Sequence, residues 1–138
     1  MKIILYGELW DGSHIDSIAK VFDKLKIKYY PFDFYEYLQY NTPFVLLNKV
    51  LRFFFLPYNR RKINIHLLEK IHSRKPTILI ISKGIDIYPK TLLEIKKNNI
   101  QIVNWNPDDF FNSKNSNKNI INSLGIYDIV FSSRKHLF

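Results

Sequence analysis

The stretch Thr77–Ser82, with the sequence TILIIS, is a nearly continuous run of apolar residues bounded by Pro76 and Lys83. Such runs are typical of parallel strands that are buried on both faces of a sheet. Lys2–Tyr6 (KIILY) and Ile100–Trp105 (IQIVNW) have the same character. We therefore expect these three segments to form the centre of a parallel β-sheet.

Segments of helical periodicity separate the expected strands. Two further strands are expected at Lys28–Phe34 and Tyr127–Ser132, and helices at about 14–26, 42–75, 89–98 and 118–124. The segment 42–75 is expected as two helices, because Pro57 should end the first and Asn59 is a candidate cap for the second. This alternation predicts an α/β fold in one domain, 1–138: a doubly wound, Rossmann-like open parallel sheet of about five strands, with strand order 3-2-1-4-5 and helices on both faces.

Composition excludes several classes of protein. There is no cysteine, which excludes disulfide scaffolds, thiolate metal sites and cysteine nucleophiles. The four histidines show no metal-ligand spacing, so we expect no metal and no cofactor. The N-terminus lacks the features of a signal peptide, and no segment has the apolar length of a spanning helix. These absences predict a cytoplasmic protein.

Positive charge is concentrated in one part of the chain. The net charge is +9, and residues 44–75 hold eight basic residues and one acidic residue. No nucleic-acid-binding signature accompanies the charge, so no nucleic-acid partner is expected. The apolar segment 44–62 has two interpretations, a helix on an anionic membrane surface or a buried crossover helix, and we favour the second. The candidate basic patch in this segment consists of Lys49, Arg52, Arg60, Arg61 and Lys62.

Polar residues follow the expected strands, at the sheet edge where doubly wound folds bind ligands. They are Gly7, Glu8, Gly12, Ser13, Lys83, Asp86, Asn106, Asp108 and Asp109. Neither a dinucleotide fingerprint nor a phosphate-binding loop is present, and Ser13, His14 and Asp108 lack the nucleophile elbow of a hydrolase. The pair Asp108–Asp109 suits a sugar hydroxyl or a cation, but a turn in the sequence NPDD explains the same residues, and we favour the turn.

The same strand-end motifs occur together in a known family. The chain resembles the N-terminal domain of the CgeB-like (spore-maturation-protein-like) glycosyltransferases, which have the two-domain GT-B architecture. The resemblance rests on KIILYGELWDGS at 2–13, YPFD at 30–33, SKGIDIYPKTLLEIK at 82–96, VNWNPDDFF at 103–111 and YDIVFSSR at 127–134. It extends in order along almost the whole chain.

The resemblance implies a domain that binds the sugar or glycan acceptor, while a second domain binds the nucleotide-sugar donor. It implies that Glu8 or Asp108 acts as general base, and that the other strand-end residues line the cleft. Since the sequence contains no donor-binding domain, we expect a truncated or split form that is inactive alone and works with a separate donor-binding domain or chain. The alternatives are a non-catalytic sugar-binding, anion-binding or regulatory module, and a peripheral binder of anionic membranes.

Overall fold

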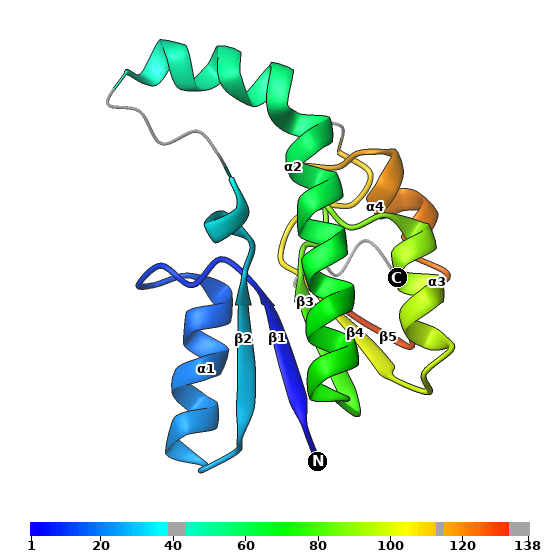
Figure 1. The fold of residues 1–138 in the computed structure, drawn as a ribbon. Coiled ribbons are helices and arrows are strands. Elements are labelled where there is room, and N and C mark those ends of the chain that lie inside the picture. The colour runs from blue at the N-terminus through cyan, green and yellow to red at the C-terminus, as the bar shows by residue number, and fades with distance from the viewer. Residues whose placement is uncertain (39–43, 113–114, 133–138) are drawn as a thin grey trace.

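The computed structural model describes residues 1–38, 44–112 and 115–132. Within these residues, five parallel strands form one open sheet in the order β2-β1-β3-β4-β5 (Figure 1). The strands are β1 (Ile3–Gly7), β2 (Tyr29–Asp33), β3 (Ile78–Ser82), β4 (Gln101–Asn106) and β5 (Ile129–Ser132). The predicted fold class, an open parallel α/β sheet with helices on both faces, is confirmed.

The position of β3 differs from the expected order 3-2-1-4-5. In the structure β3 lies between β1 and β4, so β2 is the edge strand and β1 pairs with both β2 and β3. The same alternation of strands and helices is compatible with both orders, and crossover handedness does not choose between them. The chain therefore reverses its direction across the sheet between β1 and β3.

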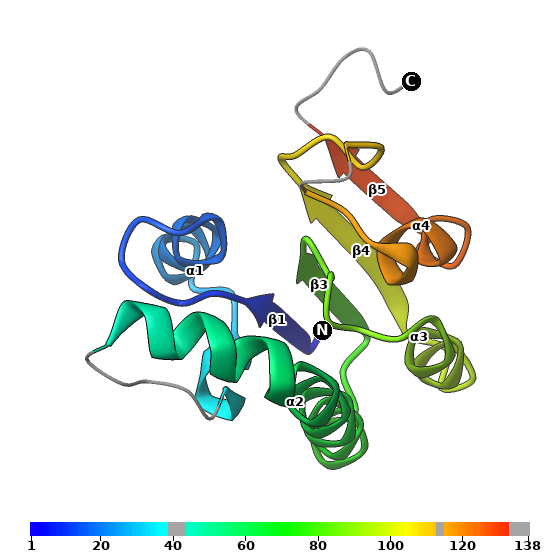
Figure 2. The same ribbon diagram turned by 90° about the horizontal axis from the view of Figure 1, so that it is seen from above.

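Helices cover the two faces of the sheet (Figure 2). The helix α1 (His14–Lys24) lies on one face, and α2 (Val45–Arg74), α3 (Pro89–Lys96) and α4 (Lys118–Ser123) lie on the other. The short 3-10 helix η1 (Phe34–Tyr37) follows β2. The hydrophobic core accordingly has two parts, one on each face of the sheet. A small apolar cluster lies beneath α1, and a larger cluster beneath α2 and α3 includes Ile63, Leu67 and Leu92.

Local sequence explains where the elements begin and end. Ser13 caps α1 by accepting a hydrogen bond from the amide of Asp16 at 3.1 Å, as expected for an N-cap serine. Pro89 occupies the first turn of α3, where its missing N–H costs nothing. Pro31 is tolerated in β2 because that strand lies at the edge of the sheet.

The segment 45–74 is one helix of 30 residues, so the prediction of two helices was wrong. Pro57 lies inside α2, and the helix bends between its projecting upper part and its lower part (Figure 1). A proline removes one hydrogen bond and kinks a helix without ending it when both halves continue in helical geometry. Asn59 is not a cap: its side chain is fully buried within α2, and neither amide atom has a hydrogen-bond partner among the described residues.

The upper half of α2 is not the buried crossover helix that we favoured from the sequence. Only the lower half, from about Asn59 onward, packs its apolar face on the sheet. Phe53 and Phe54 in the upper half are 79% and 72% exposed. None of the helices in the described ranges combines the length and the hydrophobicity that crossing a membrane requires.

Candidate functional site

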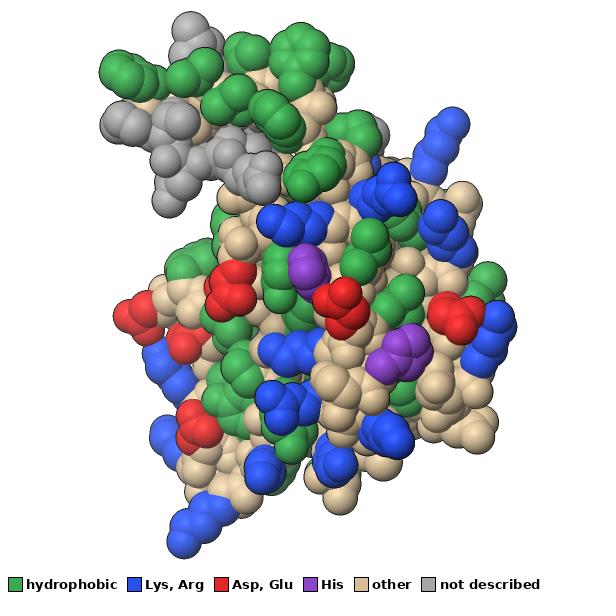
Figure 3. All heavy atoms as spheres, in the orientation of Figure 1, with side chains coloured by type: hydrophobic (Ala, Val, Ile, Leu, Met, Phe, Trp, Pro, Cys, Tyr) green, Lys and Arg blue, Asp and Glu red, His purple; other side chains and the backbone are tan. Residues whose placement is uncertain are grey.

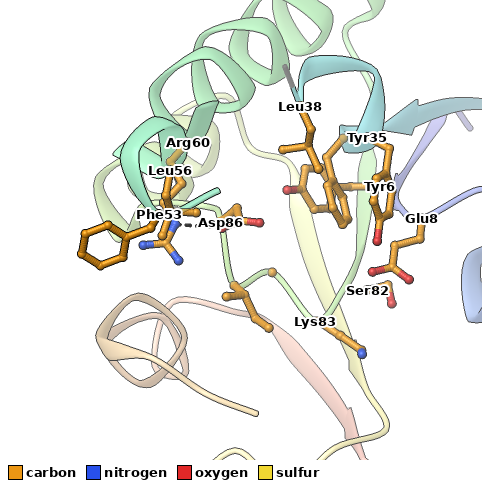
Figure 4. Close-up of a pocket in the computed structure, with 13 residues that line it drawn as sticks. Tyr6, Glu8, Tyr35, Leu38, Phe53, Leu56, Arg60, Ser82, Lys83 and Asp86 are labelled. Atoms are coloured by element: carbon orange, nitrogen blue, oxygen red, sulfur yellow. Dashed lines mark hydrogen bonds and ion pairs between the residues drawn. The ribbon is translucent and has the colours of Figure 1, made fainter. Parts of the chain in front are cut away.

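A cavity of about 470 Å³ opens at the carboxyl ends of β1 and β3 (Figure 4). This is where the chain reverses its direction across the sheet, the place where open α/β sheets bind their ligands. The residues that line it come from β1, η1, α2 and the turn after β3. They are Tyr6, Glu8, Phe34, Tyr35, Leu38, Phe53, Leu56, Arg60, Ser82, Lys83, Gly84, Ile85 and Asp86.

Stacked aromatic rings form one wall of the cavity. The ring of Tyr6 stacks on those of Phe32 and Phe34, with centroid distances of 5.4 and 5.6 Å. The ring of Tyr35 stacks on Phe34 at 5.0 Å, and Tyr37 stacks on Phe32 at 5.2 Å. Ring stacking of this kind gives a rigid apolar surface at the edge of the cavity.

The hydroxyl of Tyr6 is buried and has no hydrogen-bond partner within the described residues. A buried hydroxyl without a partner is costly, and such groups are rare in native proteins. Burial raises the pKa of Tyr6 well above its ordinary range, and the nearby carboxylate of Asp86 raises it further. The group is therefore a neutral hydroxyl whose hydrogen-bonding capacity is unused, on a residue that lines the cavity.

Two ion pairs and the carboxylate of Glu8 supply the charged groups at the site. Arg60 pairs with Asp86 at 2.8 Å, and Lys83 pairs with Asp108 at 3.1 Å. Glu8 lines the cavity and accepts a hydrogen bond from the indole of Trp10 at 3.0 Å. The cavity lining itself thus holds two carboxylates, Glu8 and Asp86, and two cations, each of which is paired with a carboxylate.

The turn after β3 carries backbone strain at the cavity wall. Lys83 has φ +60°, in the left-handed region that costs a residue with a side chain about 1 kcal/mol. The next residue, Gly84, has φ +83°, and an added Cβ there would lie 2.9 Å from the hydroxyl oxygen of Tyr127. Asn104 holds the turn by donating to the Lys83 carbonyl at 3.1 Å. From this turn the side chain of Lys83 reaches Asp108, with which it forms an ion pair.

A second hollow of about 130 Å³ lies beside the first, at the start of α1. Gly12 and Ser13 line it, together with Glu8, Ser82 and Lys83, which also line the larger cavity. Both predicted loop residues thus lie next to the site. The amide of Gly12 is already used, because it donates to the carboxylate of Asp16 at 3.0 Å.

The helix terminus beside this hollow is neutralised by the protein itself. The hydrogen bond from Lys20 lowers the pKa of Asp16, and the Gly12 amide lowers it further, so Asp16 is a carboxylate at neutral pH. Ser13 also donates its hydroxyl to the carbonyl of Glu8. An internal carboxylate thus already occupies one amide at the start of α1, the place where nucleotide-binding folds bind phosphate.

The structure assigns the remaining strand-end residues different roles. Gly7 is buried and does not line either hollow; an added Cβ would lie 2.4 Å from a side-chain carbon of Ile15, so this glycine lets α1 pack on the sheet. Asn106 accepts a hydrogen bond from the amide of Asp108 at 3.0 Å, and Asp109 accepts one from the amide of Phe111 at 2.8 Å. The side chains of Asn106 and Asp109 therefore bond to the backbone two residues further on, as in the turn that we favoured for the sequence NPDD.

Asp108 combines a place in that turn with a contact to the site. It does not itself line the larger cavity, and it reaches the site through its ion pair with Lys83. Of the two predicted acid–base candidates, Glu8 alone faces the cavity directly.

Of the predicted basic patch, the structure describes the side chains of Arg60, Arg61 and Lys62, and these lie at two different places. Arg60 lines the cavity and pairs with Asp86, whereas Arg61 and Lys62 lie together at a separate surface hollow. Lys49 and Arg52 belong to the upper half of α2, but their side chains lie outside the described residues.

The sequence interpretation missed the aromatic wall and the Tyr6 hydroxyl. Both had a signal in the sequence. Tyr6 is the last residue of the expected strand Lys2–Tyr6, and YYPFDFYEY at 29–37 brings a run of aromatic rings to the same edge of the sheet. The buried state of the Tyr6 hydroxyl depends on tertiary packing, which no local pattern reports.

Comparisons with models of protein families, with curated proteins and with solved structures found no match to this chain. In the ranges that the structure describes, no three histidine or carboxylate side chains gather where they would hold a metal ion.

Proposed function

We propose that this chain is a glycosyltransferase-like acceptor-binding domain, and that the cavity between β1 and β3 binds a neutral sugar or glycan. The observation that carries the proposal is the unpartnered hydroxyl of Tyr6, buried beside stacked rings at the cavity wall. Sugars present apolar ring faces and many hydroxyl groups. They are therefore suited to a site with aromatic rings, carboxylates and a hydroxyl group that has no hydrogen-bond partner within the described residues.

The charges of the site favour a neutral ligand over a nucleotide. Arg60 and Lys83 are each paired with a carboxylate, and Asp16 occupies the amide of Gly12 at the start of α1. A diphosphate would have to displace these internal partners. In the acceptor-side role, the donor phosphates are bound elsewhere, by a separate domain or chain. We also propose a cytoplasmic location, as the sequence predicts.

Glu8 is the candidate general base of a transfer reaction. Its carboxylate lines the cavity, where it can accept the proton of an acceptor hydroxyl as the hydroxyl oxygen attacks the sugar carbon and the donor phosphate leaves. Asp108 orients the ammonium group of Lys83. Because it acts through Lys83, Asp108 is a positioning residue in this scheme.

A non-catalytic sugar-binding or regulatory module is the second candidate. With both cations of the cavity paired, the chain by itself has no free cation there to stabilise the leaving phosphate of a donor, which suits binding without catalysis when no donor-binding domain is present. Both functions use the same cavity and the same class of ligand, and they differ only in whether Glu8 moves a proton.

Ligand-observed NMR against a panel of neutral mono- and disaccharides, with uridine diphosphate as the comparison, tests the proposal. We expect saturation transfer to at least one neutral sugar and none to the diphosphate. Glu8→Gln keeps the shape of the side chain and should retain sugar binding, while it abolishes any transfer measured with an added donor domain. Binding of the diphosphate alone would overturn the acceptor-side proposal.

A further inference from the structure

The upper half of α2 presents a large apolar surface outside the core. Phe44, Phe53, Phe54 and Tyr58 are 67%, 79%, 72% and 54% exposed. This half projects beyond the sheet (Figure 1), and hydrophobic side chains gather over it with lysine and arginine side chains just beneath (Figure 3). Monomeric proteins rarely expose contiguous apolar surface of this kind unless it contacts something.

Four of the exposed residues align along one side of the helix, whereas Phe53 lies about 120° away from them in a regular helix. Leu47, Phe54, Tyr58 and Ile65 are all exposed and are spaced by seven, four and seven positions. At about 100° per residue, this spacing places the four side chains within about 40° of one another in a regular helix. In sequence the stripe runs from Leu47 past Pro57 to Ile65, and its last two members, Tyr58 and Ile65, line one surface hollow.

Positive charge borders the stripe, and negative charge is absent from its segment. The sequence has no aspartate or glutamate between Glu36 and Glu69. Arg61 and Lys62 border a hollow of about 270 Å³ together with Tyr58. Among the described residues neither cation has an ion-pair partner, whereas the neighbouring Arg60 is paired inside the cavity.

We infer that this face of α2 docks on the surface of an anionic lipid bilayer, with the apolar stripe at the level of the acyl chains and Arg61 and Lys62 against the headgroups. Helices that lie in a membrane interface combine aromatic and aliphatic anchors with flanking basic residues. The charge favours lipid over a second copy of this chain, since two copies packed through this stripe would bring like charges together. This inference does not depend on the proposed function.

Vesicle flotation of the full chain tests the inference. The probes are vesicles of phosphatidylcholine alone and vesicles with about a quarter phosphatidylglycerol, each at about 0.05 M and about 0.5 M salt. We expect binding to the anionic vesicles at low salt, weak binding to the neutral ones, and a large loss at high salt because surface charges are screened. Absence of binding to the anionic vesicles, or equal binding to both, would overturn the inference.

Two pairs of variants identify the surface that binds. Phe54→Ala with Tyr58→Ala should lower partitioning at least about tenfold. Leu25→Ala is the control and should have no effect, because Leu25 is an apolar residue at the C-cap of α1 and is 63% exposed. Because all three side chains are exposed, thermal unfolding should be unchanged.

The charge variants complete the test. Arg61→Gln with Lys62→Gln should lower partitioning into anionic vesicles about 25-fold at low salt, from about fivefold for each charge near the surface. Lys24→Gln with Lys26→Gln removes two exposed charges on the opposite side of the sheet and should have little effect. If the aromatic variant instead abolishes concentration-dependent dimerisation and leaves flotation unchanged, the stripe is an interface between copies and the inference is wrong.

Discussion

Replacing Tyr6 by phenylalanine should stabilise the free protein and weaken its ligand binding. The tyrosine hydroxyl is buried without a hydrogen-bond partner, and a buried polar group left unsatisfied costs about 1–3 kcal/mol. Phenylalanine keeps the ring and its stacking on Phe32 and Phe34. Allowing for the small void left by the missing oxygen, we expect a gain of about 1 kcal/mol in the free energy of unfolding.

Thermal unfolding followed by circular dichroism measures this gain directly. For a chain of this size, about 1 kcal/mol corresponds to a rise of about 4 °C in Tm. Calorimetric titration with a sugar that binds the wild type should show about fivefold weaker affinity, since one hydrogen bond to the ligand is lost. Tyr30→Phe is the control, because Tyr30 is partly exposed and contacts Arg74 through its ring rather than its hydroxyl.

The two readouts separate two ways in which the reasoning can fail. A fall in Tm for Tyr6→Phe would mean that the hydroxyl has a stabilising partner in the free protein. A rise in Tm with unchanged sugar affinity would mean that the hydroxyl does not contact the ligand.

Three further changes test the packing and the charges of the site. Gly7→Ala should lower the free energy of unfolding in urea by about 1–3 kcal/mol, because the new Cβ would lie 2.4 Å from a side-chain carbon of Ile15 in α1. Gly125→Ala is the control: its Cβ would meet no atom within 4 Å, so the free energy of unfolding should not change. Arg60→Gln leaves a half-buried carboxylate unpaired and should cost about 2 kcal/mol by the same assay, while the exposed neighbour change Arg61→Gln should cost less than about 0.5 kcal/mol. The pKa of Asp128 is lowered by its hydrogen bond from the amide of Ile102 and by Lys96. The ionised carboxylate therefore stabilises the fold above the ordinary carboxyl pKa, and this contribution is lost as the pH falls through the lower pKa of the folded state. Asp128→Asn should accordingly flatten the acid side of the stability–pH curve below about pH 4.

The fold class could be predicted because each layer has a local signal. Continuous apolar runs such as Thr77–Ser82 indicate buried parallel strands, and the 3.6-residue period of 14–26 indicates the helix that covers one face. The strand order could not be predicted in the same way. The choice between the two sides of β1 for the third strand depends on which face the long helix α2 covers.

The candidate site was predicted in part. Glu8, Lys83 and Asp86 were found because polar residues after parallel strands share one edge of the sheet. The role of Gly7 and the bend at Pro57 required knowledge of what packs against them in space, as did the burial of Asn59. The exposed half of α2 was misjudged for a related reason: an apolar composition does not distinguish a helix that is buried in its own chain from one that is buried against another surface.

The central claim is that the cavity between β1 and β3 binds a neutral sugar, and amide chemical-shift mapping tests it most directly. Titration with the best-binding sugar should shift the amides of Glu8 and of Ser82 to Asp86 in ¹⁵N-labelled protein, and should leave α1 beyond its first turn and β5 unchanged. Shifts confined to other surfaces, or shifts at these amides only with uridine diphosphate, would contradict the account.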